Sequence, residues 1–288
     1  MPPPSHVQFP NGAEAPNLGL GTYGYGADPA QRDAEVAVLR IALDMGWRVF
    51  DTAEMYADGG AETVLGLALQ QAFRAGLSRD EVLLISKVLP EHASEAGVVA
   101  ACERSLRRLQ RDCIDLYMLH WPSPTPMEET VRGFEQLQRR GLIHRWGVSN
   151  FDLPQLRALL AVPGGAACAV NQVHYSLSAR GVEFDLLPAQ RVHQMPLLAY
   201  SPLDQGQLCD HPDLRELAAR YRVTPAQVAL GWVLHQGGVM ALPKAGNALH
   251  LRHNWAAQAL AAAFSAVDLA LLDRHFPPPR HKQKLSVR

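Results

Sequence analysis

Cysteines are scarce in this chain, and none of them lies close to another in sequence. The four, Cys102, Cys113, Cys168 and Cys209, are spread over 288 residues without a CxxC spacing. Closely spaced cysteines are the usual sequence signature of a structural metal site or a disulfide framework. We therefore expect reduced thiols, no bound metal and a cytoplasmic location.

The chain also lacks a strong charge of either sign and a long apolar run. Charged residues make up 19% and the net charge is −1, which argues against nucleic acid or an anionic membrane as a partner. The apolar stretch from Ala256 to Leu272 is interrupted by polar residues, which favours a packed surface helix over a membrane span. Met1 to His6 shows no basic or apolar run of the kind found in secretory signals. We expect a soluble protein.

Short apolar stretches suited to buried strands alternate with helical patterns along the chain. Eight such stretches end near Thr22, Asp51, Lys87, His120, Asn150, Gln172, Tyr200 and Lys244. Strand-then-helix units with apolar strands indicate a parallel sheet with right-handed crossovers. Eight units in 288 residues favour an α/β fold of the closed (β/α)8 TIM-barrel type, with an open doubly wound sheet as the alternative.

The ends of the chain add elements to this repeat. The turn signal Pro10-Asn11-Gly12 lies between short extended segments and predicts an N-terminal β-hairpin. After the eighth strand we expect extra C-terminal helices. No Gly- and Ser-rich linker divides the sequence, so we predict one domain over residues 1–288.

Four residues able to carry a proton-transfer reaction stand at or just beyond consecutive strand ends. They are Asp51, Tyr56, Lys87 and His120. In a barrel, the carboxyl ends of the strands share the face that holds the active site. A nearby ammonium group would lower the pKa of the tyrosine, and a carboxylate would hold the lysine in place. Singly, each residue also fits a structural role as a cap, a loop aromatic, a solvated cation or a core histidine; together they indicate protonation of a carbonyl oxygen.

Two further sequence patterns are weak evidence for a dinucleotide fingerprint and for a metal site. Gly19 to Gly24 fits G-x-G-x-x-G, but residues 25–29 separate it from the next helix, whereas a dinucleotide fingerprint opens directly into one. His250 and His253 are one helical turn apart, yet no third residue with metal-ligand spacing accompanies them. We interpret the histidines as a solvated or nucleotide-facing surface.

An ordered series of motifs covers nearly the whole chain, from about Gly19 to Asn254. The motifs are Asp51-Thr-Ala-Glu-Met-Tyr56, Ser86-Lys87, Asp115-Leu-Tyr-Met-Leu-His120-Trp121-Pro122, Gly147-Val-Ser149-Asn150-Phe151, Asn171-Gln172, Tyr200-Ser201-Pro202-Leu203 and Leu242-Pro243-Lys244. This series resembles the aldo-keto reductases, in particular the bacterial reductases of aldehydes and dicarbonyls. The resemblance implies a monomeric (β/α)8 barrel that binds NADPH without a Rossmann domain.

The resemblance also implies roles for individual residues. Tyr56 would be the general acid, Lys87 and Asp51 the pair that lowers its pKa, and His120 the residue that orients the carbonyl. The implied cofactor-binding residues are Gly21, Thr22, Asp51, Ser149, Asn150, Gln172, Tyr200, Ser201, Pro202, Leu203, Pro243, Lys244, Ala245, His250, His253 and Asn254. The implied substrate-binding residues are Tyr23, Tyr56, Leu89, His120 and Trp121. Within the cofactor set, Tyr200 would stack on the nicotinamide, while Ser149, Asn150 and Gln172 would hold its carboxamide.

Departures from the family pattern concern the adenosine end and the substrate pocket. Ala245 replaces a serine, His250 stands where an arginine is usual and His253 replaces a glutamate, so NADH is possible beside NADPH. Lys244 could still pair with a 2′-phosphate. Tyr23 stands where tryptophan is common, and the segments around residues 122–128 and after Phe276 are short. A more open pocket predicts broad specificity for small aldehydes.

We therefore predict an NADPH-dependent oxidoreductase that transfers hydride to aldehydes, dicarbonyls or sugar-derived carbonyls. The alternative from another class is a non-catalytic, nucleotide-binding regulatory or sensor protein on the same fold. An aldolase that uses Lys87 as a Schiff base is a weaker rival.

Overall fold

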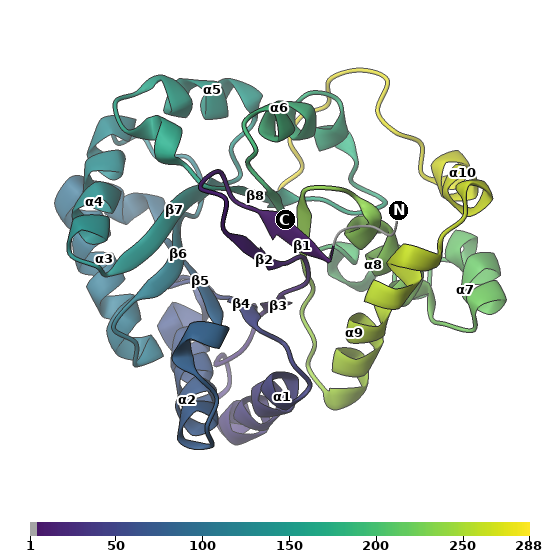
Figure 1. The fold of residues 1–288 in the computed structure, drawn as a ribbon, viewed down its shortest axis with the longest axis horizontal. Coiled ribbons are helices and arrows are strands. Elements are labelled where there is room, and N and C mark those ends of the chain that lie inside the picture. Colours follow the sequence, from purple (N-terminus) through teal and green to yellow (C-terminus); the bar gives the residue numbers. More distant parts are fainter. Residues whose placement is uncertain (1–4) are drawn as a thin grey trace. The chain divides into compact units, whose positions relative to one another are not determined.

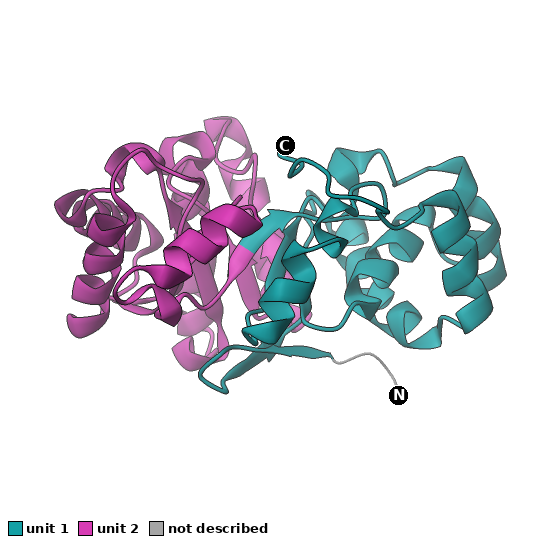
Figure 2. Ribbon diagram, turned by 90° about the horizontal axis from the view of Figure 1, so that it is seen from above, with its two compact units in different colours: residues 1–19, 172–288 teal, residues 20–171 magenta. Residues whose placement is uncertain are grey.

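The computed structural model describes residues 5–288, which form two compact units (Figure 2). Unit 2 comprises Leu20–Asn171, and unit 1 comprises the described residues up to Gly19 together with Gln172–Arg288. Met1 to Pro4, part of the segment in which we expected no export signal, lie outside the described residues. The prediction of a single domain stays a prediction.

Unit 2 is built from strand-then-helix repeats (Figure 1). Its strands are β3 (Leu20–Gly21), β4 (Val49–Asp51), β5 (Leu83–Val88), β6 (Ile114–Leu119) and β7 (Ile143–Ser149). Its helices are α1 (Arg32–Asp44), α2 (Gly60–Arg74), α3 (Glu95–Leu109), α4 (Met127–Arg139) and α5 (Leu153–Ala161). Each strand pairs in parallel with the next one along the chain. The five strand ends predicted in this part of the chain each lie within one residue of an observed strand end, and a helix follows each strand, as predicted.

The core of unit 2 explains why its strands are almost continuously apolar. In β4 every residue is buried, and in β6 only Asp115 is partly exposed. The helices pack closely on these strands: the Phe134 ring of α4 stacks on Trp146 of β7 with 5.1 Å between ring centroids. Gly147 is required beside Trp146, because a Cβ atom there would lie 2.5 Å from Val170 Cγ2.

Unit 1 contains the N-terminal hairpin and the second group of repeats. The hairpin pairs β1 (His6–Gln8) with β2 (Glu14–Pro16), and Gly12 takes the φ of +82° that its turn needs. The other strands and helices are β8 (Asn171–His174), which begins at the last residue of unit 2, β9 (Leu197–Tyr200), β10 (Val239–Leu242), α6 (Leu186–Val192), α7 (Arg215–Tyr221), α8 (Pro225–His235), α9 (Ala248–Ala263) and α10 (Ala266–His275). The predicted hairpin and closing helices are thus confirmed.

The parallel strands follow one another in chain order, β3 through β10. Successive right-handed β/α units place each strand beside the one before it in the chain. In a doubly wound sheet, by contrast, the order of the strands reverses at a switch point. The predicted sixth strand is displaced toward the C-terminus: we expected it to end near Gln172, whereas β8 ends at His174. The amide of Ala169, ahead of β8, already donates to the Trp146 carbonyl at 2.9 Å.

In the described part of the chain, no single helix is long and apolar enough to cross a membrane. The helices α9 and α10 reach the required length and apolarity only when taken together, and they are bent by 114°.

Candidate active site

The register of β4, β5 and β6 brings three of the predicted catalytic residues to one place. Asp51 is paired with Ile85, and Lys87 lies two residues further along β5. Lys87 in turn is paired with Met118, and His120 lies two residues beyond Met118. Side chains two residues apart on a strand point to the same side, so Asp51, Lys87 and His120 share one face of the sheet. The stagger between neighbouring strands makes them diagonal neighbours.

The ammonium group of Lys87 is the centre of this cluster. Its Nζ atom lies 2.8 Å from both carboxylate oxygens of Asp51, 2.8 Å from the carbonyl oxygen of Thr52 and 3.3 Å from the Tyr56 hydroxyl. Lys87 is fully buried and Asp51 nearly so. A buried lysine surrounded by a carboxylate and two further oxygens has acceptors for all three of its N–H groups.

Tyr56 opens a short 3₁₀ turn, Tyr56–Gly59, and residues 52–55 connect this turn to the end of β4. Ala57 and Asp58 in that turn take left-handed backbone conformations, with φ of 52° and 50°. Such conformations are strained in residues other than glycine and persist where the surrounding structure fixes them. The turn places the Tyr56 ring edge-on to the rings of Tyr23, at 5.3 Å, and His120, at 5.7 Å.

The pKa of Tyr56 differs from our expectation. Burial, followed by the Asp51 carboxylate and Tyr23, raises the pKa of the phenol well above 10. The prediction that Lys87 and Asp51 lower this pKa is therefore wrong for the free protein, because removal from water disfavours the phenolate more than Lys87 favours it. The hydroxyl is consequently protonated at neutral pH, which is the form that a proton donor needs.

Burial also lowers the pKa of Lys87, and the Asp51 carboxylate opposes that shift. The short bonds to Asp51 favour the charged ammonium form of the lysine. Asp51 therefore keeps the positive charge beside the Tyr56 hydroxyl. That charge would stabilise the phenolate left behind when Tyr56 donates its proton.

His120 is neutral. Burial, with a smaller contribution from Lys87, lowers the pKa of its imidazole to about 2. Its Nδ1 atom has no hydrogen-bond partner among the described residues. The backbone carbonyl of His120 accepts a hydrogen bond of 3.2 Å from Nδ2 of Asn150, which fixes this strand end. A neutral imidazole can donate one hydrogen bond to a substrate oxygen without competing for the proton of Tyr56.

Glu54 is a site residue to which the sequence analysis gave no role. Its buried carboxylate accepts hydrogen bonds from the amide of Leu89 at 2.8 Å and from Arg104 at 3.3 Å, and lies 2.9 Å from His92 Nδ1. Its own amide donates to the Lys87 carbonyl at 3.3 Å. Glu54 thereby ties the β4 end to the β5 end behind the catalytic cluster. The sequence signal that could have identified Glu54 was an acidic residue between the two predicted catalytic residues Asp51 and Tyr56.

The predicted substrate-binding residues gather around the catalytic cluster in unit 2. Tyr23, whose side chain is 64% exposed, contacts the Tyr56 ring, and the Trp121 ring lies 5.0 Å from that of His120. Leu89 is half-buried on the loop that Glu54 holds. The helix α1 begins only at Arg32, so no helix opens on the Gly19–Gly24 motif.

Four predicted cofactor residues besides Asp51 also lie in unit 2. The Thr22 hydroxyl donates to the Asp51 carbonyl at 3.0 Å, so it supports the catalytic strand end, and Gly21 is paired with Asp51. Ser149 ends β7, and Asn150 beyond it has a left-handed φ of 60°. The side-chain amide of Asn150 donates a hydrogen bond of 3.2 Å to the Ser149 hydroxyl, so these two residues present adjacent polar groups.

The remaining predicted cofactor residues lie in unit 1, in two groups. The first lies in β8 and at the end of β9: Gln172 of β8 is buried, and the Tyr200 ring stacks on His174 with 5.7 Å between centroids. Ser201 and Asp204 have left-handed φ values of 47° and 49°. This loop, Ser201–Asp204, contains Pro202 and Leu203 and is held in a strained conformation, as is common at ligand sites.

The second group surrounds the N-terminus of α9, where Lys244 and His250 are exposed and Pro243, Ala245 and Asn254 are buried. Asn247 caps the helix, because its side chain accepts a hydrogen bond of 2.8 Å from the His250 amide. His253 lies one turn into the helix and is half-buried. A helix N-terminus with Lys244 before it suits a phosphate group.

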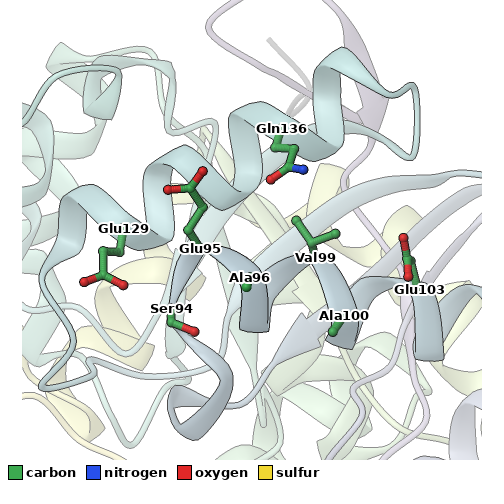
Figure 3. A pocket seen from close by; sticks show the side chains of 8 residues that line it. All are labelled: Ser94, Glu95, Ala96, Val99, Ala100, Glu103, Glu129 and Gln136. Carbon is green, nitrogen blue, oxygen red and sulfur yellow. The ribbon is translucent and has the colours of Figure 1, made fainter.

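A groove on the outside of unit 2, lined by α3 and α4, has a different character (Figure 3). It encloses about 540 Å³, and its polar groups are mainly the carboxylates of Glu95, Glu103 and Glu129. Glu95 and Glu103 are paired with Arg132 and Arg140. No group of three or more His, Cys, Asp or Glu residues in the described chain is arranged to hold a metal ion. The catalytic cluster therefore remains the candidate active site.

Parallel β/α repeats that carry a buried Asp–Lys–Tyr cluster and a neutral histidine at their strand ends define a class of barrel oxidoreductase acting on carbonyl groups. The family model of the aldo/keto reductase family matches residues 17–276. A methylglyoxal reductase of Escherichia coli, YeaE, is 45% identical over 98% of both chains. A glyoxal reductase of Bacillus subtilis is 34% identical over 83% of this chain and 81% of its own. The chain belongs to the aldo-keto reductase family and is an NAD(P)H-dependent oxidoreductase.

Solved structures agree with this assignment. An aldo/keto reductase from Klebsiella pneumoniae in complex with NADP and acetate superimposes with a TM-score of 0.93 at 45% identity and covers 99% of both chains. A thermostable aldo-keto reductase, Tm1743, has a TM-score of 0.85 at 34% identity, with 93% of this chain and 98% of that chain covered. The predicted (β/α)8 barrel with its N-terminal hairpin is confirmed.

Proposed function

We propose that the protein is an NADPH-dependent reductase of small aldehydes and dicarbonyls in which Tyr56 is the general acid. The observation that carries the proposal is the arrangement around Lys87 Nζ, which lies 2.8 Å from Asp51 and 3.3 Å from the Tyr56 hydroxyl. Burial keeps the Tyr56 phenol protonated by raising its pKa. The site thus holds one transferable proton beside a fixed positive charge.

The residues divide the work of reducing a carbonyl group. His120, neutral because its pKa is lowered to about 2, donates a hydrogen bond that orients the substrate oxygen. NADPH, when bound, supplies the hydride for the carbonyl carbon. Tyr56 gives its proton to the developing alkoxide, and the Lys87 ammonium stabilises the resulting phenolate. Asp51 keeps Lys87 charged and in position.

The residues of the chain fit NADPH by their chemistry. In unit 2, Ser149 and Asn150 supply hydrogen-bonding groups for the carboxamide. In unit 1, Tyr200 supplies a ring for the nicotinamide. The α9 N-terminus and Lys244 supply positive potential for the 2′-phosphate. Ala245 contributes no hydroxyl and His250 no guanidinium, so we propose a modest preference for NADPH over NADH.

The substrate end favours small carbonyl compounds. Tyr23 is 64% exposed and Met55 37%, so the side chains around Tyr56 form a loose boundary with few fixed polar contacts. Two relatives are a methylglyoxal reductase and a glyoxal reductase, which act on small dicarbonyls. We propose methylglyoxal and similar aldehydes as substrates, and a cytoplasmic monomer as the working form.

Steady-state reduction of methylglyoxal, glyoxal and a series of aldehydes and ketones with NADPH or NADH tests the proposal. We expect turnover of several small aldehydes with similar kcat/KM. A thousandfold preference for one ketone would refute the open-pocket proposal. Tight NADPH binding without turnover of any carbonyl would instead identify a nucleotide sensor, and borohydride trapping of the substrate on Lys87 would identify a Schiff-base aldolase.

A further inference from the structure

The segment after α10, residues 277–288, returns to the strand ends of unit 1 and touches the predicted cofactor residues there. The amide of Arg288 donates a hydrogen bond of 3.3 Å to the Tyr200 hydroxyl. The Arg288 guanidinium lies 2.8 Å from the Asp204 carboxylate. The Ser286 hydroxyl lies 2.9 Å from Nδ1 of His174. These contacts connect the segment to the Tyr200 ring, which the proposed function assigns to the nicotinamide, and to the loop that contains the predicted cofactor residues Ser201, Pro202 and Leu203.

Asp204 is an unusual neighbour for a bound nucleotide. The Asp204 side chain is only 5% exposed, and Asp204 directly follows Ser201, Pro202 and Leu203 in the sequence. The family resemblance implies that Ser201 and Leu203 line the pyrophosphate. A buried, uncompensated carboxylate beside a pyrophosphate would repel it. The Ser178 hydroxyl donates to Asp204 at 2.8 Å but brings no charge. A cation is needed to make this loop compatible with an anionic ligand.

His174 does not provide that cation. Its Nε2 atom is 3.5 Å from Asp204, but burial lowers the pKa of the imidazole, and this outweighs the opposing influence of Asp204. Arg288 carries a permanent charge and is in hydrogen-bond range of the carboxylate. The neutral His174 instead acts as the stacking partner of the Tyr200 ring, at 5.7 Å and 19°.

We propose that Arg288 is a cofactor-positioning residue: by neutralising Asp204 it makes the Ser201–Asp204 loop able to bind the pyrophosphate of NADPH, and its backbone holds the Tyr200 ring. This inference rests on the proposed cofactor site. Arg288 acts through Asp204 and Tyr200, so its loss should affect ligands that contain the pyrophosphate and spare those that contain only the adenosine end.

Isothermal titration of the full chain with three nucleotides tests the inference. NADPH contains every group, 2′-phospho-ADP-ribose lacks the nicotinamide, and adenosine 2′,5′-bisphosphate lacks both the nicotinamide and the pyrophosphate. The variants are Arg288→Gln, Arg288→Lys, Asp204→Asn and the double variant Asp204→Asn/Arg288→Gln. Lys284→Gln is the matched control, because Lys284 is an exposed cation on the same segment.

We expect Arg288→Gln to weaken NADPH and 2′-phospho-ADP-ribose by about tenfold, the scale of a close charge pair, and adenosine 2′,5′-bisphosphate by less than about twofold. Arg288→Lys and Lys284→Gln should stay within about twofold of wild type. In the Asp204→Asn background, Arg288→Gln should have almost no further effect, because the charge to be neutralised is gone.

Three results would overturn the inference. Unchanged NADPH affinity in Arg288→Gln would show that the ion pair is irrelevant to the cofactor. Equal weakening of all three nucleotides would indicate general disruption. A tenfold loss that persists in Asp204→Asn would mean that Arg288 contacts the nucleotide itself. Failure of the proposed function is seen separately, as wild-type protein that binds NADPH but reduces no aldehyde.

Discussion

Replacing Tyr56 by phenylalanine removes the proposed proton donor and little else. The ring contacts to Tyr23 at 5.3 Å and His120 at 5.7 Å do not involve the hydroxyl, so the packing should survive. Among the described residues, the substitution removes the 3.3 Å hydrogen bond that Lys87 donates to the Tyr56 hydroxyl. The variant therefore separates proton transfer from structure.

The magnitude follows from the role of the hydroxyl. A positioned general acid contributes about 10²- to 10⁴-fold to a rate, or about 3 to 5.5 kcal/mol of barrier. The upper part of this range applies, because neutral His120, with its pKa of about 2, offers only a hydrogen bond and does not replace the lost proton donor. We expect kcat for methylglyoxal reduction to fall by about 10³-fold or more, while the Kd for NADPH changes by less than about twofold.

The assay follows the absorbance of the reduced nicotinamide, with NADPH affinity measured on the same preparation. Tyr221→Phe is a useful control, because it also removes a phenol hydroxyl, one that bonds to Asp268 at 2.6 Å, and it should leave kcat unchanged. A Tyr56→Phe enzyme that retains more than about a tenth of wild-type kcat would refute the assignment. Loss of NADPH binding would show instead that the substitution disturbs the site.

Four further predictions concern charge and pH. Lys87→Met should lower the free energy of unfolding by about 3–5 kcal/mol, because it leaves buried Asp51 without its counter-ion; chemical denaturation should show that Asp51→Asn/Lys87→Met recovers much of this stability but no activity. Because the pKa of Tyr56 lies well above 10 and that of His120 at about 2, kcat for reduction should be level between about pH 6 and 9, and a titration near neutrality that disappears in His120→Gln would contradict this. His120 binds a proton in the unfolded chain below about pH 6.5 but not in the folded one, so it should destabilise the fold by about 1.4 kcal/mol per pH unit below that value, a slope that His120→Gln removes in denaturation curves. Finally, His250→Arg should raise the NADPH-to-NADH ratio of kcat/KM by about tenfold, through a charge-assisted bond to the 2′-phosphate; an unchanged ratio would show that this position does not face the phosphate.

Much of this protein could be predicted from local sequence. Apolar runs that stop at a polar residue predicted the strand ends at Asp51, Lys87 and His120, and the alternation of such runs with helical patterns predicted the β/α repeat. These features depend on side chains a few residues apart, and β4, β5 and β6 accordingly end within one residue of the predicted positions. The catalytic residues followed because strand ends of one barrel share a face.

Other properties depend on residues that are distant in sequence. The direction of the Tyr56 pKa shift results from burial, which is created by the packing of the whole unit and cannot be read from the motif. Glu54 accepts a hydrogen bond from Arg104, fifty positions away in the sequence. Arg288, which follows α10 in the sequence, contacts Tyr200 and Asp204, which precede that helix. The sequence by itself determined which groups stand at the strand ends, because periodicity and turn signals are local. Only the tertiary structure decided how far each group is removed from water and which charge lies beside it, because desolvation and ion pairing are set by long-range packing.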